Sequence, residues 1–299
     1  MGNKDFQILL YYRYVNLENP AIFCKKQRAL CEKLNLKGRI ILAQEGINGT
    51  LEGEKEDTEK YILEMDKISE FKGISYKKSK GTGSAFPKLS VKVRPEIVST
   101  HIEGIDPTKL TGKYITADEL HLWFEKKKEF YLVDMRNDYE YLSGYFANFI
   151  PSGMRNFYDL KEVLPRINHL KNKTIVTVCT GGIRCEKASG FLLQNGFSDV
   201  YQLQDGIQSY MEKYPNKHFK GKLYVFDKRL IIGFHKDNEE EIVGKCIHCG
   251  SKSENYVNCE YNFCHFHYIS CSNCLDKETG LAFCKAECKE MYLRKRIVV

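Results

Sequence analysis

Residues 174–187 read TIVTVCTGGIRCEK, and this stretch decides how the centre of the chain folds. Its first five residues are apolar or β-branched, which predicts a short buried strand at Thr174–Val178. A helix is expected to begin near Arg184 and to run to Gly196, because glycine commonly follows the last turn of a helix. Residues 179–183 would then form a loop at the carboxyl end of a strand, where parallel α/β sheets bind their ligands.

The segments on either side of this stretch predict the rest of a parallel sheet. Tyr131–Asp134 and Asp199–Leu203 have the apolar or aromatic composition of short strands. Residues 116–119 read TADE, a capping box, which predicts a helix from there to about Lys128. Strands that alternate with helices at this spacing form parallel sheets, so we expect an α/β domain at residues 116–220.

The loop carries the two residues that we expect to be catalytic, Cys179 and Arg184. Gly181 and Gly182 let the backbone curl so that N–H groups point inward, and the helix N-terminus behind them adds partial positive charge. Both effects favour the thiolate, the form of cysteine that attacks electrophiles, and Arg184 adds a fixed positive charge. The alternative is a cysteine that is merely buried in a glycine-rich turn. The two glycines, the arginine and the helix start together argue against that alternative.

Other residues of this region have supporting roles in the prediction. The residues expected to form the anion-binding loop are Thr180, Gly181, Gly182 and Ile183. Cys185 lies in the first turn of the helix, and two interpretations of it stay open: a resolving thiol for oxidised Cys179, or a small packed side chain. For Arg136 we expect a structural contact with Asp134 or a backbone carbonyl rather than a catalytic role.

Residues 1–95 predict a second domain of a different class. The expected elements follow the order βαββαβ, which indicates a ferredoxin-like or acylphosphatase-like sandwich. The expected strands are Phe6–Tyr12, Arg39–Ala43, Gly49–Leu51, Ile74–Lys78 and Leu89–Val93, and the expected helices are Pro20–Leu34 and Lys55–Ile68. We expect Glu45–Thr50 to be a tight turn, with Gly46 and Gly49 serving its backbone geometry. Residues 96–115 contain the glycines and proline of an expected linker.

Tyrosines and cations of the N-terminal domain predict contact with RNA. The formal net charge of +7 is compatible with an RNA partner but does not require one. Aromatic faces stack on unpaired bases and cations hold phosphates, so an anticodon loop is a suitable target. The alternative for any one of these residues is a solvated strand face. The residues concerned are Tyr11, Tyr12, Arg13, Tyr14, Lys77, Lys78, Lys80, Lys88, Lys92 and Arg94.

Eight of the twelve cysteines lie between Cys246 and Cys288, which marks residues 221–299 as a separate Cys-rich module. Eight thiols suit two tetrahedral zinc sites of a structural kind, because four thiolates leave no open coordination position. Disulfides are disfavoured in the reducing compartment that we expect. One expected set is Cys246, Cys249, Cys271 and Cys274, and the other is Cys259, Cys264, Cys284 and Cys288, with His265 as a substitute ligand.

Several motifs resemble those of a known family. The loop from Cys179 to Arg184, with four residues between them, resembles a rhodanese active-site loop and is one residue shorter than that of cysteine-based phosphatases. The whole chain resembles the bacterial, rhodanese-domain-containing tRNA uridine hydroxylases. The motifs that carry this resemblance are CTGGIRCEKA at 179–188, DMRNDYE at 134–140, EGINGT at 45–50, FPKLSVKV at 86–93 and the Cys-rich tail.

The resemblance implies a fold and an activity. The fold would be an α/β and α+β multidomain chain with a rhodanese-like catalytic domain. The activity would be the oxygen-dependent conversion of the wobble uridine of tRNA to 5-hydroxyuridine, with molecular oxygen as co-substrate and tRNA, through its anticodon loop, as partner. Two alternatives stay open: a persulfide-forming sulfurtransferase that uses the same loop, and a non-catalytic RNA-binding or zinc-scaffold protein. No flavin-binding or nicotinamide-binding motif is evident in the sequence.

The sequence also indicates where the protein works. No apolar stretch approaches the ~20 residues that span a bilayer. Residues 1–6 lack the basic-then-apolar layout of a signal peptide. We therefore expect a cytoplasmic protein with reduced cysteines and no membrane contact.

Overall fold

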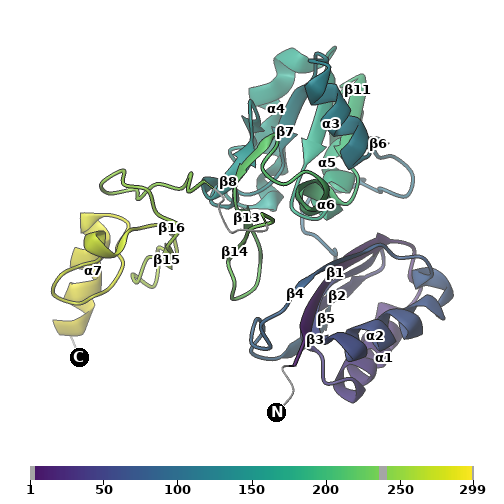
Figure 1. The fold of residues 1–299 in the computed structure, drawn as a ribbon, viewed down its shortest axis with the longest axis horizontal. Helices are drawn as coiled ribbons and strands as arrows, with labels where there is room; N and C mark the ends of the chain where they lie inside the picture. The colour runs from purple at the N-terminus through teal and green to yellow at the C-terminus, as the bar shows by residue number, and fades with distance from the viewer. Residues whose placement is uncertain (1–3, 236–240, 298–299) are drawn as a thin grey trace.

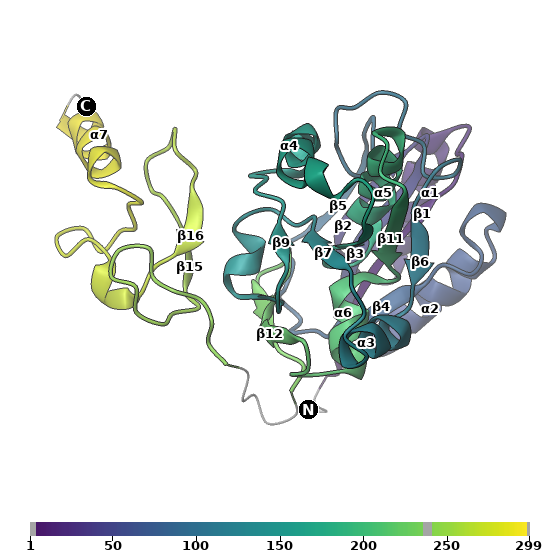
Figure 2. The same ribbon diagram turned by 90° about the horizontal axis from the view of Figure 1, so that it is seen from above.

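The computed structural model describes residues 4–235 and 241–297. Residues 1–3, on which part of the signal-peptide prediction rests, lie outside the described residues. The chain forms an N-terminal sheet covered by helices, a central parallel sheet, and a Cys-rich tail. The first strands of the tail lie beside the central domain, and its last part, with the C-terminal helix, lies to one side in both views (Figures 1 and 2). Among the described residues, no helix has both the length and the apolar character needed to cross a membrane.

The N-terminal domain forms the predicted sandwich with all five expected strands, one more than the βαββαβ order contains. Its strands are β1 (Phe6–Tyr14), β2 (Lys37–Ala43), β3 (Gly46–Glu54), β4 (Tyr76–Lys80) and β5 (Leu89–Val93), and its helices are α1 (Pro20–Lys33) and α2 (Lys55–Asp66). The sheet order is β4-β1-β3-β2-β5. The first four strands are antiparallel in the ferredoxin-like order, and β5 extends the sheet by pairing parallel with β2.

The two faces of this sheet have different neighbours. Leu9 and Tyr11 of β1 are buried in the core that the sheet shares with Cys31 of α1 and Tyr61 of α2. Ile8, Leu10 and Tyr12 alternate with them and therefore lie on the opposite face, toward the central domain. In Figure 1 both helices lie on the side of the sheet away from the central domain.

The tight turn predicted at Glu45–Thr50 is wrong, because β3 already begins at Gly46. The two-residue connection from Ala43 to Gly46 is the true turn, and Ala43 pairs with Gly46. The glycines serve close packing within the sheet instead. A Cβ at Gly46 (φ +140°) would lie 2.0 Å from the Arg13 carbonyl oxygen, and one at Gly49 would lie 2.2 Å from the Tyr11 ring.

The central domain confirms the predicted parallel sheet. Its five parallel strands run in the order β6-β11-β10-β7-β9. Its elements are β6 (Lys113–Ile115), α3 (Ala117–Glu125), β7 (Tyr131–Asp134), β8 (Gly144–Phe146), β9 (Ile150–Pro151), α4 (Val163–Ile167), β10 (Thr174–Val178), α5 (Ile183–Gln194), β11 (Asp199–Leu203), α6 (Gly206–Lys213) and β12 (Phe219–Gly221). The capping box at Thr116 makes both of its hydrogen bonds. Strand β6 lies within residues 96–115, so part of that segment is an edge strand of the central sheet.

The tail contains little regular structure. Its strands are β13 (Leu223–Tyr224), β14 (Ile231–Ile232), β15 (Tyr256–Asn258) and β16 (His267–Ile269), and its helix is α7 (Ala286–Ile297). Its small core combines the aromatic side chains of Tyr268 and Phe283 with the buried thiols Cys259 and Cys288. A core of this size requires a further source of stability, which the clustered cysteines offer.

Candidate active site

The end of strand β10 places Cys179 at the bottom of a tightly curled loop. The loop turns through Gly182, whose φ of +97° lies in the left-handed region that favours glycine, and α5 begins at the next residue. The Gly182 N–H donates to the Cys179 Sγ at 3.2 Å. The helix N-terminus therefore directs its unpaired N–H groups at the sulfur, as the sequence predicts.

Two segments hold the loop from opposite sides. From below, the N-terminus of α6 donates its Ile207 N–H to the Cys179 carbonyl at 2.9 Å and its Gln208 N–H to the Thr180 carbonyl at 3.1 Å. From above, β1 of the N-terminal domain packs on the two loop glycines. A Cβ at Gly181 would lie 2.8 Å from Leu10, and one at Gly182 would lie 2.8 Å from the Tyr12 hydroxyl. The glycines thus serve both the curl and the contact between domains.

The surroundings of Cys179 favour its thiolate although its side chain is only 1% exposed. Burial raises the pKa of the thiol. A hydrogen bond from Cys185, the charge of Arg184 and the backbone N–H groups of Cys185 and Arg184 outweigh burial and lower the pKa to about 6. Cys185 is fully buried beside it, and burial together with the Cys179 thiolate keeps the pKa of Cys185 well above its ordinary value. One thiol of the pair is thus ionised and the other donates to it.

Arg184 is held by a carboxylate that sequence analysis did not assign to it. Both terminal nitrogens of its guanidinium bond the carboxylate of Glu140, one of them at 2.8 Å. The Thr180 hydroxyl lies 3.3 Å from the Glu140 carboxylate and 3.3 Å from Nη2 of Arg184, so it hydrogen-bonds both members of the pair. Glu140 is fully buried and lies far from the loop in sequence, so no local spacing could link it to Arg184. The pair fixes the guanidinium beside the loop.

The predicted structural contact of Arg136 is confirmed. Its Nε lies 2.9 Å from the Asp134 carboxylate, and its Nη2 donates to the Gly144 carbonyl at 2.8 Å. Both charged side chains are fully buried. This pair closes the turn after β7 and so supports the segment that carries Glu140.

A cavity of about 310 Å³ lies between the loop and the N-terminal sheet. It is bounded by β1, β2 and β3 on one side and by the loop on the other, with a segment of the tail closing one end. The residues that line it are Ile8, Leu10, Tyr12, Arg39, Ile41, Asn48, Thr50, Ser79, Val98, Asn137, Phe157, Thr180, Gly181, Ile183, Arg184, Gln208, Val225, Phe226, Asp227 and Arg229. The surface that these residues expose to the cavity is mainly apolar, although half of them are polar or charged, a combination that is usual in a small-molecule site.

The aromatic and basic residues predicted to contact RNA divide into two groups. Tyr12 and Tyr14 lie between the domains, where their hydroxyls donate to Glu186 at 3.1 Å and to the Ile183 carbonyl at 3.2 Å. Tyr11 is fully buried, so the prediction that it stacks on RNA is wrong. The prediction is also wrong for Lys77, which is 4% exposed and pairs with Asp205 at 2.7 Å. The exposed cations are Lys78, Lys80, Lys88, Lys92 and Arg94.

A buried lysine fixes the N-terminal domain to helix α5. Lys187 is 1% exposed, and its Nζ lies 2.9 Å from the carboxylate of Glu45 and 2.6 Å from that of Glu96. Glu45 belongs to the turn between β2 and β3, and Glu96 to the segment after β5. The sequence gives no indication of this contact, because its three members come from distant parts of the chain.

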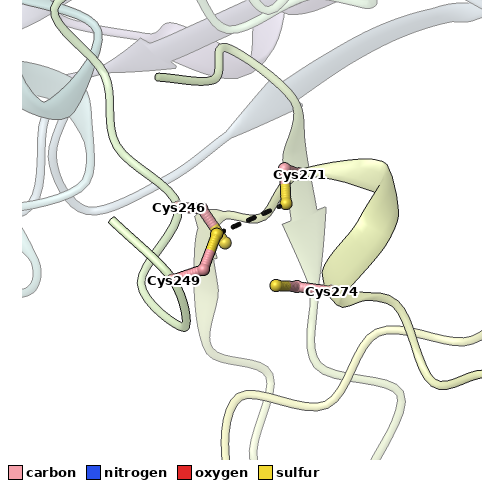
Figure 3. Close-up of side chains that lie close together, drawn as sticks. All are labelled: Cys246, Cys249, Cys271 and Cys274. Atoms are coloured by element: carbon pink, nitrogen blue, oxygen red, sulfur yellow. Dashed lines mark hydrogen bonds between the residues drawn. The ribbon is translucent and has the colours of Figure 1, made fainter. Parts of the chain in front are cut away.

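The tail brings together the two sets of four cysteines that the sequence predicts. Within each set the sulfur atoms all lie within 4.8 Å of one another. Cys249 and Cys271 are 3.7 Å apart in the first set, drawn in Figure 3, and Cys264 and Cys284 are 3.5 Å apart in the second. Four sulfurs at ~2.3 Å from one zinc ion would be separated by roughly 3.8 Å. Each set therefore has the geometry to bind a metal ion, and His265 belongs to neither.

A third group with metal-binding potential was missed by sequence analysis. It comprises His121 and Glu125 of α3 with His218, whose donor atoms also lie within 4.8 Å of one another. His218 Nε2 is 3.0 Å from the Glu125 carboxylate, an ordinary surface contact, whereas His121 Nδ1 lies 3.2 Å from the Tyr210 hydroxyl. Spacing within the helix could have indicated the first two residues but not the third.

Comparison with known proteins finds relatives along nearly the whole chain. Residues 6–97 match the family described as the UPF0176 acylphosphatase like domain, residues 116–213 the Rhodanese-like domain and residues 220–289 the Rhodanase C-terminal family. A tRNA uridine(34) hydroxylase of Cytophaga hutchinsonii is 41% identical over 96% of this chain and 90% of its own length. The chain belongs to the tRNA uridine(34) hydroxylase family. Another member, from Staphylococcus carnosus, is 39% identical over 96% of this chain and 90% of its own.

A solved structure resembles the central part alone. The rhodanese-like domain protein of Staphylococcus aureus is 29% identical, covers 33% of this chain and 90% of its own, and has a TM-score of 0.29. The membership of the tRNA uridine(34) hydroxylase family thus rests on the full-length relatives. It confirms the family resemblance seen in the sequence and the predicted combination of three modules.

Proposed function

We propose that this protein hydroxylates the wobble uridine (U34) of tRNA at carbon 5 and that Cys179 is its nucleophile. The observation that carries the proposal is the position of Cys179, a thiol with a lowered pKa in a loop that borders a cavity of about 310 Å³. Family membership supports the same reaction, since the full-length relatives bear that name.

The chemistry follows from the electrophilic character of carbon 6 of uracil. Addition of the Cys179 thiolate to carbon 6 would place a negative charge on the enolate formed by carbon 5 and the carbonyl at carbon 4. Carbon 5 would then take one oxygen atom from molecular oxygen, while the other leaves as water with two electrons and two protons from an external thiol reductant. Loss of the proton on carbon 5 and departure of the Cys179 sulfur would restore the ring as 5-hydroxyuracil.

Arg184 and the loop would stabilise the charge that develops in this reaction. The guanidinium is already positioned by Glu140, so little reorganisation is needed when the enolate forms. The loop N–H groups that favour the thiolate would stabilise it again when the Cys179 sulfur departs from carbon 6. Cys185 would protect the nucleophile: if Cys179 were oxidised to a sulfenic acid, the Cys185 thiol would displace water from it to form a disulfide.

The exposed cations of the N-terminal domain would hold the tRNA. Lys88, Lys92 and Arg94 lie along and beside β5, the edge strand of the sheet. They are suited to the phosphates that flank an anticodon loop, because cations bind the backbone without regard to sequence. The unpaired base would enter the interdomain cavity, where apolar side chains line the space.

Two structural zinc ions would stabilise the tail. Each set of four cysteines has the sulfur separations that tetrahedral zinc requires. The ions would take no part in the reaction, because four thiolates leave no open position for substrate. Their contribution would be to fold a segment whose own apolar core is small.

Mass spectrometry of total tRNA from a gene-deletion strain tests the proposed reaction. The strain is complemented with the wild-type chain, with Cys179→Ser, or with Cys24→Ser as a control that changes a remote thiol in α1. We expect the wild type and the control to restore 5-hydroxyuridine and Cys179→Ser to reduce it more than about 1,000-fold. Loss of 2-thiouridine instead of 5-hydroxyuridine, with a persulfide on Cys179, would establish the sulfurtransferase alternative.

A further inference from the structure

Asn137 belongs to the cavity wall and has an unused hydrogen-bond acceptor. Its side chain lines the cavity and is 7% exposed. Its Oδ1 is buried and has no hydrogen-bond partner. Among the described residues that line the cavity, it is the one with such a side-chain atom. An unpaired buried acceptor destabilises the protein that contains it, so its presence in a site calls for a ligand that donates to it.

The Asn137 amide contacts a tyrosine hydroxyl through its nitrogen. Its Nδ2 donates to the Tyr139 hydroxyl at 2.7 Å, which leaves Oδ1 as the free end of the amide. Its backbone N–H donates at 2.9 Å to Glu140 Oε1, an oxygen of the carboxylate that holds Arg184. The acceptor therefore lies in the same hydrogen-bonded group as the guanidinium beside Cys179.

Uracil carries a hydrogen-bond donor that can pair with this acceptor. Its N3 carries a hydrogen and can donate, whereas N3 of cytosine is an acceptor and would face Oδ1 with two lone pairs opposed. We propose that Asn137 is a specificity-determining residue, whose Oδ1 accepts the N3–H of the target uracil and thereby excludes cytosine from the cavity. This inference rests on the proposed tRNA substrate and adds how the base is selected.

The expected discrimination follows from the burial of the acceptor. A site built to hydrogen-bond a substrate group rejects analogues that lack it far more strongly than a hydrophobic pocket rejects a missing methylene. Cytosine and 3-methyluracil both lack the N3–H and would leave Oδ1 unpaired in the complex. We expect each to bind at least about tenfold more weakly than uracil, which is the effect of about 1.4 kcal/mol.

Equilibrium binding to full-length Cys179→Ser protein tests the assignment without chemical turnover. The ligands are anticodon stem–loop RNAs that differ only at position 34, which carries uridine, cytidine or 3-methyluridine. In the Cys179→Ser background we expect Asn137→Ala to bind all three within about threefold of one another, and Asn137→Asp, which keeps an acceptor at that position, to retain the preference for uridine.

Asn156 supplies a matched control, because its Nδ2 also donates to the tyrosine two residues on, at 2.6 Å, but outside the cavity lining. Asn156→Ala should keep the preference for uridine. Equal binding of cytidine and uridine by the protein with Asn137, absence of RNA binding, or a preference that survives Asn137→Ala would overturn the assignment. A preference that depends on Asn137 in a protein that makes no 5-hydroxyuridine would uphold it and would refute only the proposed reaction.

Discussion

Cys179 and the eight cysteines of the tail show one side chain in two opposite settings. Cys179 ends a parallel strand, is 1% exposed, and faces backbone N–H groups and the Arg184 guanidinium. The tail cysteines come from turns, irregular segments and short helical segments, and they face one another, with sulfurs 3.5 Å apart between Cys264 and Cys284. In the first setting the protein itself stabilises negative charge on one sulfur. In the second, four sulfurs that would repel one another as thiolates require a cation.

The difference shows how environment, rather than residue type, determines what a cysteine does. A thiolate held by fixed dipoles keeps its lone pairs free to attack an electrophile. Four thiolates that share a metal ion donate their lone pairs to it and fill all four of its coordination positions. The reactive cysteine therefore belongs to the part of the chain with a large apolar core, and the clustered cysteines belong to the part without one.

The largest effect is expected in the tail, where bound metal ions would substitute for a large apolar core. Cys271→Ser removes one ligand from the first cluster, and structural zinc in small modules contributes apparent binding energies of roughly 10–16 kcal/mol. We expect elemental analysis after gentle purification to find two zinc ions in the wild type and one in the variant. Limited proteolysis should cut the variant faster within the tail.

Cys24→Ser, a change to a half-buried thiol in α1, is the control and should keep both metal ions. The comparison of the two settings fails if wild-type protein with an intact tail carries no metal. It also fails if Cys271→Ser retains the full zinc content, since the four sulfurs would then not act together.

A smaller effect is expected from the carboxylate that positions Arg184. Glu140→Gln removes the charged partner of the guanidinium, and a misplacement of about 1 Å costs on the order of 100-fold in rate. We therefore expect hydroxylation to fall about 10- to 100-fold. Removal of a negative charge near the loop cannot destabilise the Cys179 thiolate, so its titration midpoint, read at 240 nm against Cys179→Ser, should not rise.

Glu103→Gln, a change to an exposed carboxylate, is the matched variant and should leave both readouts unchanged. If the midpoint of Glu140→Gln rises together with the loss of rate, Glu140 would act by holding the loop in shape. Its role in positioning Arg184 would then be refuted.

The two regions also differ in what the sequence could predict. The pair of Cys179 and Arg184 and the two sets of tail cysteines follow from local spacing. A strand, a loop and a helix start predict the first, and closely spaced cysteine pairs suggest the second. Glu140 and Lys187 could not be assigned, because each meets its partners only after the chain folds. The alternation of β1 predicts two faces, but it does not say that Tyr11 meets helices and Tyr12 meets another domain.

The smallest expected effect concerns the hydrogen bond from Cys185, in the first turn of α5, to Cys179 in the loop. Cys185→Ala removes the thiol that donates to Cys179, while Cys185→Ser keeps a donor at that position. Hydrogen bonds to charged groups contribute about 1.5–3 kcal/mol, which corresponds to roughly one to two pKa units. In the folded wild type the pKa of Cys179 is lowered to about 6 from the ordinary 9.0, so its thiolate persists as the pH falls until about 6.

In Cys185→Ala the midpoint at 240 nm should therefore move upward from about 6, toward the ordinary value of 9.0. Hydroxylation at pH 6.5 should fall about 3- to 25-fold, for a rise of one to two pKa units, and recover at pH 8.5, where the thiolate forms without the extra donor. Cys185→Ser should titrate like the wild type. A midpoint that stays in place in Cys185→Ala would mean that the backbone N–H groups and Arg184 hold the charge alone. The Cys179 thiolate would then be stabilised without a second sulfur, in contrast to the tail cysteines, which lie in groups of four.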